Sequence, residues 1–410
     1  MTLEAPGQRA AVFGVAIAEL LAMSLWFSAT AIIPELTRDW MISSRTAAWL
    51  TMSVQLGFVV GALVSAALNL ADRFEVRRLF ATCAIAGCVI AFASAAIPES
   101  WSTRVEILLG LRFLTGFVLA GVYPPGMKLV AGWCRTNRGF CIGLLVGALT
   151  VGSSLPLLLA AFGSSVGGLS WRMIIRFAGG LCLLGAVIVW RYGVDGPFAT
   201  PGSRFSWRHA FAGFRERPTR LANFGYLGHM WELYAMWAWV PIVLVNVYAQ
   251  HGWSTGAARI AGFATIASGG LGALVAGRLA DQFGRTNTTV ASLVVSGSCA
   301  LVAGILLGSP ALLTALCLVW GFAVVADSAQ FSAAVSELAD QRYVGTALTM
   351  QTCMGFLLTM VTIRAVPLVA GATSWGLALA MLAIGPVFGI ASMLALRRLP
   401  EASLMTGGRK

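Results

Sequence analysis

Apolar residues run along this chain in long stretches that short polar segments separate. Each stretch is about 20 residues long, which at about 1.5 Å per residue crosses the roughly 30 Å of hydrocarbon in a bilayer. Backbone amides in lipid must be satisfied within their own segment, so each stretch is predicted to be a helix. The pattern predicts about twelve transmembrane helices, at Ala10–Pro34, Thr46–Leu70, Leu79–Ile97, Val105–Val130, Gly139–Gly163, Trp171–Tyr192, Leu221–Ala249, Gly256–Ala280, Thr288–Gly308, Ala311–Ala334, Gly345–Gly371 and Trp375–Leu396.

The first predicted helix has a second interpretation, as a cleaved signal peptide. It is longer than the apolar core of such a peptide, which spans about 7–15 residues, and it carries Glu19. Its removal would also leave an odd number of spans. We therefore expect it to remain as a membrane helix.

Composition supports an all-α membrane protein. Hydrophobic residues make up 58% of the 410 positions and charged residues 11%, whereas soluble domains carry about 25% charged residues. A mean hydropathy of +0.82 leaves too few polar side chains to cover a surface in water.

Charge placement predicts the orientation of the chain. Most of the 28 Lys and Arg fall in loops on the side that holds both termini, and positive residues concentrate on the cytoplasmic side of membranes. The chain is therefore predicted to be a multi-pass protein of the inner (cytoplasmic) membrane with both termini in the cytoplasm. The net charge of +12 follows from this bias and requires no nucleic-acid partner.

The eight cysteines lie mostly inside the predicted spans and lack the spacing of metal ligands. We expect them to be small buried residues rather than disulfides or zinc ligands.

A polar segment divides the chain near its middle. Residues 195–223 hold three prolines and five arginines, and we expect residues 194–220 to form a cytoplasmic connector. Its arginines could also bind the anionic inner leaflet. The connector would join an N-terminal six-helix bundle, residues 1–193, to a C-terminal six-helix bundle, residues 221–410.

Two segments repeat between the predicted halves. Leu-Ala-Asp-x-Phe at Leu70–Phe74 recurs at Leu279–Phe283, 209 positions later (281 minus 72). A Ser-Trp pair opens the sixth span at Ser170–Trp171 and the twelfth at Ser374–Trp375. Because both repeats occur in equivalent loops, they indicate duplicated halves.

The second copy carries a resemblance to a known family. Gly277–Arg285 resembles the loop motif of the major facilitator superfamily, Gly-x-Leu-Ala-Asp-x-Phe-Gly-Arg, and Arg112 in the fourth span is similar to the start of that family's Arg-x-x-x-Gly pattern. The first copy departs from the motif, because Glu75-Val76 replaces its Gly-Arg. Ala148 stands where the family's antiporter motif has proline. The resemblance covers essentially the whole chain and implies two pseudo-symmetric bundles that rock around a cavity lined by spans one, four, seven and ten.

Charges inside a membrane are costly and mark candidate functional sites. Those within the spans that the resemblance assigns to the cavity are Glu19, Arg112, His229, Glu232 and Asp327. A carboxyl group in the apolar surroundings of the tenth span could exchange protons near neutral pH. The full set of candidates for substrate binding or proton coupling is completed by Tyr226, Trp320, Gln330 and Arg364.

Each candidate has a structural alternative. Arg112 could pair with Glu19 across the first and fourth helices, and His229 could hydrogen-bond a neighbouring helix. The aromatic residues of the seventh span could pack on neighbours or lie at the membrane interface. Arg364 could extend its side chain to the outer interface.

The two loop motifs suggest a cytoplasmic gate. Asp72 and Arg73 lie in the first copy, and Asp281 and Arg285 in the second. A carboxylate there can interact with a helix N-terminus and with nearby arginine, at about 0.3–2 kcal/mol for each contact. Since the first copy is degraded, we expect Asp281 and Arg285 to form the stronger clasp.

These features favour secondary transport of a small polar or anionic organic solute by alternating access, coupled to protons, in a carrier that functions as a monomer. The alternative is drug or toxic-compound efflux by proton antiport, which the aromatic seventh span favours and Ala148 disfavours. We expect no enzyme, cofactor or metal site, since the sequence lacks a nucleotide-binding glycine loop, a metal cluster and a nucleophile with a base at a telling spacing.

Overall fold

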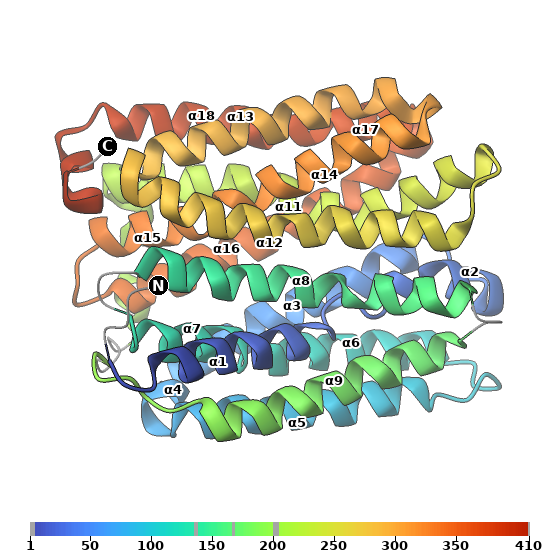
Figure 1. The fold of residues 1–410 in the computed structure, drawn as a ribbon, viewed down its shortest axis with the longest axis horizontal. Coiled ribbons are helices and arrows are strands. Elements are labelled where there is room, and N and C mark those ends of the chain that lie inside the picture. The colour runs from blue at the N-terminus through green and yellow to red at the C-terminus, as the bar shows by residue number, and fades with distance from the viewer. Residues whose placement is uncertain (1–4, 135–137, 166–168, 200–204, 409–410) are drawn as a thin grey trace.

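The computed structural model describes residues 5–134, 138–165, 169–199 and 205–408, and every regular element in that part of the chain is a helix. Figure 1 shows the long helices side by side, with their axes along the long dimension of the molecule. The elements that precede residue 193 are α1 (Gln8–Met23), η1 (Thr30–Ile32), α2 (Ile33–Trp40), α3 (Ser44–Ala67), α4 (Leu70–Arg73), α5 (Val76–Ala95), α6 (Arg104–Leu119), α7 (Tyr123–Ala131), α8 (Arg138–Ser165) and α9 (Trp171–Tyr192).

The predicted connector holds two short elements, η2 (Trp207–His209) and α10 (Ala212–Arg215), and residues 200–204 of it lie outside the described residues. The elements that follow are α11 (Arg217–Gln250), α12 (Thr255–Phe283), α13 (Arg285–Ala303), η3 (Gly304–Gly308), α14 (Pro310–Ala326), α15 (Ser328–Leu338), α16 (Val344–Ala372), α17 (Trp375–Ala380), η4 (Met381–Ala383), α18 (Ile384–Arg397) and η5 (Pro400–Gly408).

Eleven segments of the described residues are long and apolar enough to cross a membrane. The predicted first span, Ala10–Pro34, is not among them because its helix is interrupted. Helix α1 ends at Met23, and a turn over Ser24–Ala29 precedes η1 and α2. Counted with this broken span, the chain has the twelve spans that its hydrophobic pattern predicts.

Two further spans break at equivalent places. The fourth is interrupted at Ala120–Val122, between α6 and α7, and the tenth at Asp327, between α14 and α15. These breaks lie 206 positions apart (327 minus 121), close to the separation of the loop motifs. The sequence repeat therefore extends to the shape of the helices.

Glycines allow close approach of the helices beside these breaks. An ideal Cβ on Gly116 of α6 would lie 1.8 Å from the carbonyl oxygen of Val54 in α3. One on Gly321 of α14 would lie 1.7 Å from the carbonyl oxygen of Thr265 in α12. No side chain fits at such distances, so both helix pairs pack through glycine, as small residues allow in membranes.

The elements up to α9 occupy the lower part of Figure 1, and those from α11 onward occupy the upper part. Helix α8 packs on α12, and α3 packs on α16, so that these pairs join the two parts. Both termini lie at the same end of the molecule (Figure 1), which we call the terminal end; the other is the opposite end. The division at residues 193 and 220 stays a prediction.

One expectation about the cysteines is wrong. Cys134, after α7, and Cys141, in α8, form a disulfide with their Cα atoms 6.7 Å apart. The two cysteines are seven positions apart in the sequence. The remaining six cysteines are free; Cys83 is half-buried and the others are buried.

Candidate functional site

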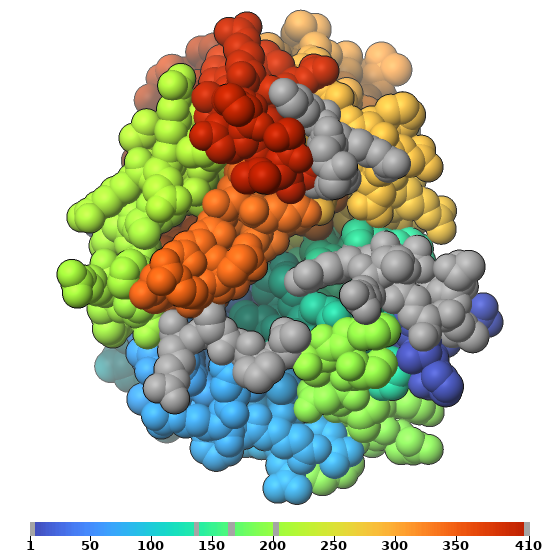
Figure 2. Space-filling view, turned by 90° about the vertical axis from the view of Figure 1, so that its left-hand side faces the viewer, coloured from blue at the N-terminus to red at the C-terminus, as the bar shows by residue number. Residues whose placement is uncertain are grey.

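A cavity of about 1240 Å³ reaches from the terminal end toward the middle of the molecule. Figure 2 views this end, where the orange α15–α16 region lies across from the blue α4–α5 region. Asp72, Lys128 and Arg342 line the cavity near that end, and Tyr226 and His229 line it deeper inside. Because residues of α3, α7, α11 and α16 all contribute, the cavity lies between the two parts of the fold, and we call it the central cavity.

A buried histidine and aspartate meet at the wall of the central cavity. His229 Nδ1 of α11 lies 2.8 Å from Oδ1 of Asp327, and both side chains are at most 2% exposed. The other ring nitrogen, Nε2, shares a hydrogen bond of 2.8 Å with the Ser328 hydroxyl. The break between α14 and α15 at Asp327 places both partners against one imidazole. The structure thus brings together two of the residues predicted from sequence.

Glu232 lies one turn further along α11 and is fully buried. Its Oε1 accepts a hydrogen bond of 2.7 Å from Trp320 Nε1, and its Oε2 accepts one of 2.8 Å from the Ser296 hydroxyl. The carboxyl group therefore connects α11 with α13 and α14. Glu232 and Trp320 were both predicted, whereas nothing in the sequence distinguished Ser296 or Ser328 from other membrane serines.

Aromatic rings from both parts of the fold close the inner end of the central cavity. The ring of Trp26 lies 5.9 Å from that of Tyr234 and 5.4 Å from that of Phe356, and Phe27 lies 5.9 Å from Trp237. Tyr234, Trp237 and Phe356 face the cavity. We call these five residues the aromatic partition.

Arg112 stabilises the broken first span. It is 3% exposed, and its guanidinium donates to the carbonyl oxygens of Leu25 (3.0 Å) and Trp26 and to the hydroxyl of Ser28 (3.0 Å). In the turn after α1, the carbonyl oxygen of Leu25 also accepts from Ser28, and the guanidinium fork supplies further donors to both carbonyls. Arg112 is not among the residues that line the central cavity, and the alternative pairing with Glu19 is not seen.

Glu19 is fully buried in α1, and neither carboxylate oxygen has a hydrogen-bond partner among the described residues. The carboxyl group lies against α7, since a Cβ on Gly126 would come within 2.4 Å of its Oε2. An ionised carboxylate without partners is costly in such surroundings. Glu19 is therefore suited to hold a proton.

The two predicted gate motifs make different contacts. Asp72 forms an ion pair with Lys128, within the same part of the fold, and Arg73 is exposed. The carboxylate of Asp281 lies at the first turn of α8, where a Cβ on Gly139 would be 2.7 Å from its Oδ2. Asp281 of α12 thus contacts the N-terminus of α8 in the other part of the fold, where a negative charge is favourable.

The structure pairs Arg285 with other partners than Asp281. Its guanidinium donates to both carboxylate oxygens of Glu337, at 2.8 and 2.6 Å, and to Oε1 of Gln330 at 2.8 Å. The Arg285 guanidinium therefore reaches from Gln330 in the first turn of α15 to Glu337 in its last turn. Arg364 is half-buried in α16 and lines neither cavity described here.

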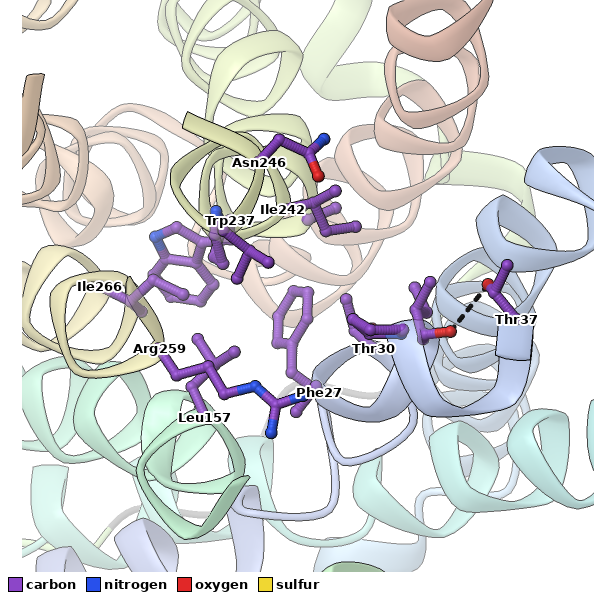
Figure 3. A pocket seen from close by; sticks show the side chains of 15 residues that line it. Phe27, Thr30, Thr37, Leu157, Trp237, Ile242, Asn246, Arg259 and Ile266 are labelled. Carbon is purple, nitrogen blue, oxygen red and sulfur yellow. Dashed lines mark hydrogen bonds between the residues drawn. The ribbon is translucent and has the colours of Figure 1, made fainter. Parts of the chain in front are cut away.

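A second, smaller cavity of about 320 Å³ lies toward the opposite end, on the other side of the aromatic partition. Figure 3 shows its lining side chains, which include Phe27, Leu157, Trp237, Asn246, Arg259 and Ile266. We call it the small pocket. Trp237 and Phe27 separate it from the central cavity.

Arg259 joins the two parts of the fold beside the small pocket. Its side chain is 8% exposed and forms an ion pair with Glu35 of α2, and Nη1 donates to the carbonyl oxygen of Ala160 in α8 at 2.8 Å. This pair was not predicted from the sequence, because Arg259 lies near the end of a predicted span. Its position three residues inside that span was the available signal.

Comparison with protein families matches residues 15–360 to the Major Facilitator Superfamily. The chain is 30% identical to the 4-hydroxybenzoate transporter PcaK of Pseudomonas aeruginosa over 168 residues, 38% of this chain and 34% of that protein. It is 29% identical to the niacin transporter NiaP of Acinetobacter baylyi over 115 residues, 28% of this chain and 25% of that protein. These matches thus span about a third or less of each relative's length.

Among solved structures, the proton:xylose symporter XylE superposes with a TM-score of 0.71 at 15% identity, over 95% of this chain and 96% of that one. At this identity the likeness concerns the fold alone. The relatives named here are transporters rather than enzymes.

Proposed function

The chain belongs to the Major Facilitator Superfamily, and on that premise we propose that it carries a small organic anion across the inner membrane by alternating access, coupled to protons. The observation that carries the proposal is the central cavity of about 1240 Å³, which ends at the aromatic partition and has the His229–Asp327 pair in its wall. The proposal places the terminal end in the cytoplasm and takes the carrier as a monomer, so that the central cavity would open inward.

The anion that fits best is an aromatic carboxylate. Tyr226, Tyr234 and Trp237 line the central cavity and can stack on a planar ring. His229 and Ser328 can supply hydrogen-bond donors for a carboxylate. The names of the relatives, a 4-hydroxybenzoate transporter and a niacin transporter, support this class.

Proton coupling follows from the buried acids. Glu19, Glu232 and Asp327 are fully or almost fully buried in spans, where an ionised carboxylate is costly. A proton on Asp327 weakens its contact with Nδ1 of His229, so that the imidazole can turn to the carboxylate of the solute. Solute and proton then bind together, as symport requires.

The alternative is efflux of drugs or toxic compounds by proton antiport. The aromatic walls would suit an apolar cation, and buried carboxylates would neutralise it. This reading predicts that the solute and the proton compete for the same acid, rather than bind together.

Purified protein in proteoliposomes distinguishes the two. A pH gradient, acid outside, should drive accumulation of 4-hydroxybenzoate or nicotinate and leave tetraphenylphosphonium unaffected. Asp327→Asn should abolish the dependence on the gradient, whereas Asp39→Asn, an exposed acid of α2, should not. Anion uptake indifferent to the gradient refutes symport, and proton-driven expulsion of tetraphenylphosphonium supports the alternative.

A further inference from the structure

We propose that the small pocket is a separate binding site for a neutral molecule with one aromatic ring, and that occupation of this site holds the opposite end closed. The site differs from the central cavity in its position, in its charge and in the effect that a bound ligand has on the carrier. Its assignment rests on the geometry of the pocket and stands whether or not the proposed solute is correct.

The walls of the small pocket come from both parts of the fold. Phe27 belongs to the broken first span and Leu157 to α8, whereas Trp237 and Ile266 belong to α11 and α12. Figure 3 shows these side chains pointing toward a common space. The rings of Phe27 and Trp237, whose centroids lie 5.9 Å apart, form the floor of the small pocket.

The size of the small pocket suits one ring with a short substituent. Its volume of about 320 Å³ is about twice that of an engineered cavity of roughly 150 Å³ that binds benzene. Apolar and aromatic side chains dominate the lining, which is typical of sites for small organic molecules.

The charge of the small pocket selects a neutral ligand. The positive charge of Arg259 is neutralised by Glu35, and the hydroxyls of Thr30 and Thr37 are hydrogen-bonded to Thr51 and to a backbone carbonyl, each at 2.8 Å. A carboxylate would have to displace Glu35 or lose its hydration without compensation. The exposed amide of Asn246 at the rim can donate to an ester or carbonyl oxygen.

Binding at this site depends on conformation. Because its walls belong to both parts of the fold, separation of these parts at the opposite end pulls the walls apart. A ligand that binds one conformation and not the other shifts the population toward the first. At ten times its Kd, a ligand would withdraw about nine-tenths of the carrier from the transport cycle.

Ethyl 4-hydroxybenzoate, a neutral single-ring ester, is the probe. It should raise the Tm of the purified protein, and a saturating concentration of the 4-hydroxybenzoate anion should not abolish that rise. Leu157→Trp fills the pocket and should remove the rise, whereas Leu158→Trp, on the same helix but outside the lining, should retain it.

Asn246→Ala, at the exposed rim, provides a second variant if Leu157→Trp fails to fold. It should raise the Kd for the ester. Equal Tm shifts in Leu157→Trp and Leu158→Trp refute the site. Loss of the shift upon addition of the 4-hydroxybenzoate anion would place the ester in the central cavity and overturn the proposal as well.

Discussion

Arg259 offers the sharpest test of how the opposite end is held closed. Its guanidinium binds Glu35 of α2 and the carbonyl oxygen of Ala160 in α8, whereas its own helix, α12, belongs to the other part of the fold. Arg259→Ala removes both contacts. If the parts separate at this end during transport, the substitution should favour the outward-open conformation.

The expected size of the shift toward the outward-open conformation follows from the burial of the Arg259–Glu35 ion pair. Removal of one partner from a buried ion pair costs about 3–5 kcal/mol. The Glu35 side chain is 16% exposed, so water relieves part of that cost, and we take roughly 1.5–3 kcal/mol. Because about 1.4 kcal/mol corresponds to a factor of ten, the outward-open population should rise by about 10- to 100-fold.

Labelling from outside measures that population. Ala31 is 3% exposed and lines the small pocket, so a cysteine at this position should react faster with an impermeant maleimide when the opposite end opens. Arg172→Ala is the matched control, because Arg172 pairs with Glu99 at 3.1 Å within one part of the fold. Equal labelling rates for Arg259→Ala and Arg172→Ala would refute the reasoning.

Two further predictions concern stability. Gly116→Ala should destabilise the protein by about 1–3 kcal/mol through overpacking against α3, whereas Gly110→Ala on the same helix meets open space and should be neutral; chemical unfolding in micelles compares them. Glu232→Ala should cost about 1–3 kcal/mol for each donor that it leaves unpaired, Ser296 and Trp320. Glu232→Gln should keep most of the stability while altering proton-driven uptake, and equal unfolding free energies for the two variants would contradict this assignment.

The spans could be predicted from the sequence because apolar length alone determines what crosses a bilayer. The repeat of the loop motifs further indicated that the fourth and tenth spans are equivalent. The break in the fourth span has a sequence signal, Gly121 followed by Pro124–Pro125, whereas no proline or glycine adjoins Asp327, so the sequence did not mark both breaks. The first span breaks over Ser24–Ala29, where partners distant in the sequence, above all Arg112, donate to the backbone carbonyls of the turn.

The sequence predicted which residues form the candidate site better than it predicted the contacts between them. Ionisable residues are costly inside a membrane, and this criterion identified His229, Glu232 and Asp327 without any knowledge of their partners. The contact between His229 and Asp327 depends on how α11 packs against the break after α14. The spacing of residues within one span carries no information about that packing. Arg112 shows the converse, because its burial was evident while its role in the first span required the positions of two backbone carbonyls and the Ser28 hydroxyl.

The gate hypothesis changes once contacts within a part of the fold are distinguished from contacts between the parts. Alternating access requires that contacts between the parts form and break at the two ends. Arg285 binds Glu337 and Gln330, all within the second part, so this cluster stiffens α13 against α15 and does not itself gate. Asp281 lies against the N-terminus of α8 in the first part, and Arg259 joins α12 to α2 and α8 at the other end. Both of these contacts between the parts are made by α12. In the proposed alternating-access cycle, this helix would release its partners at one end of the molecule as it binds them at the other.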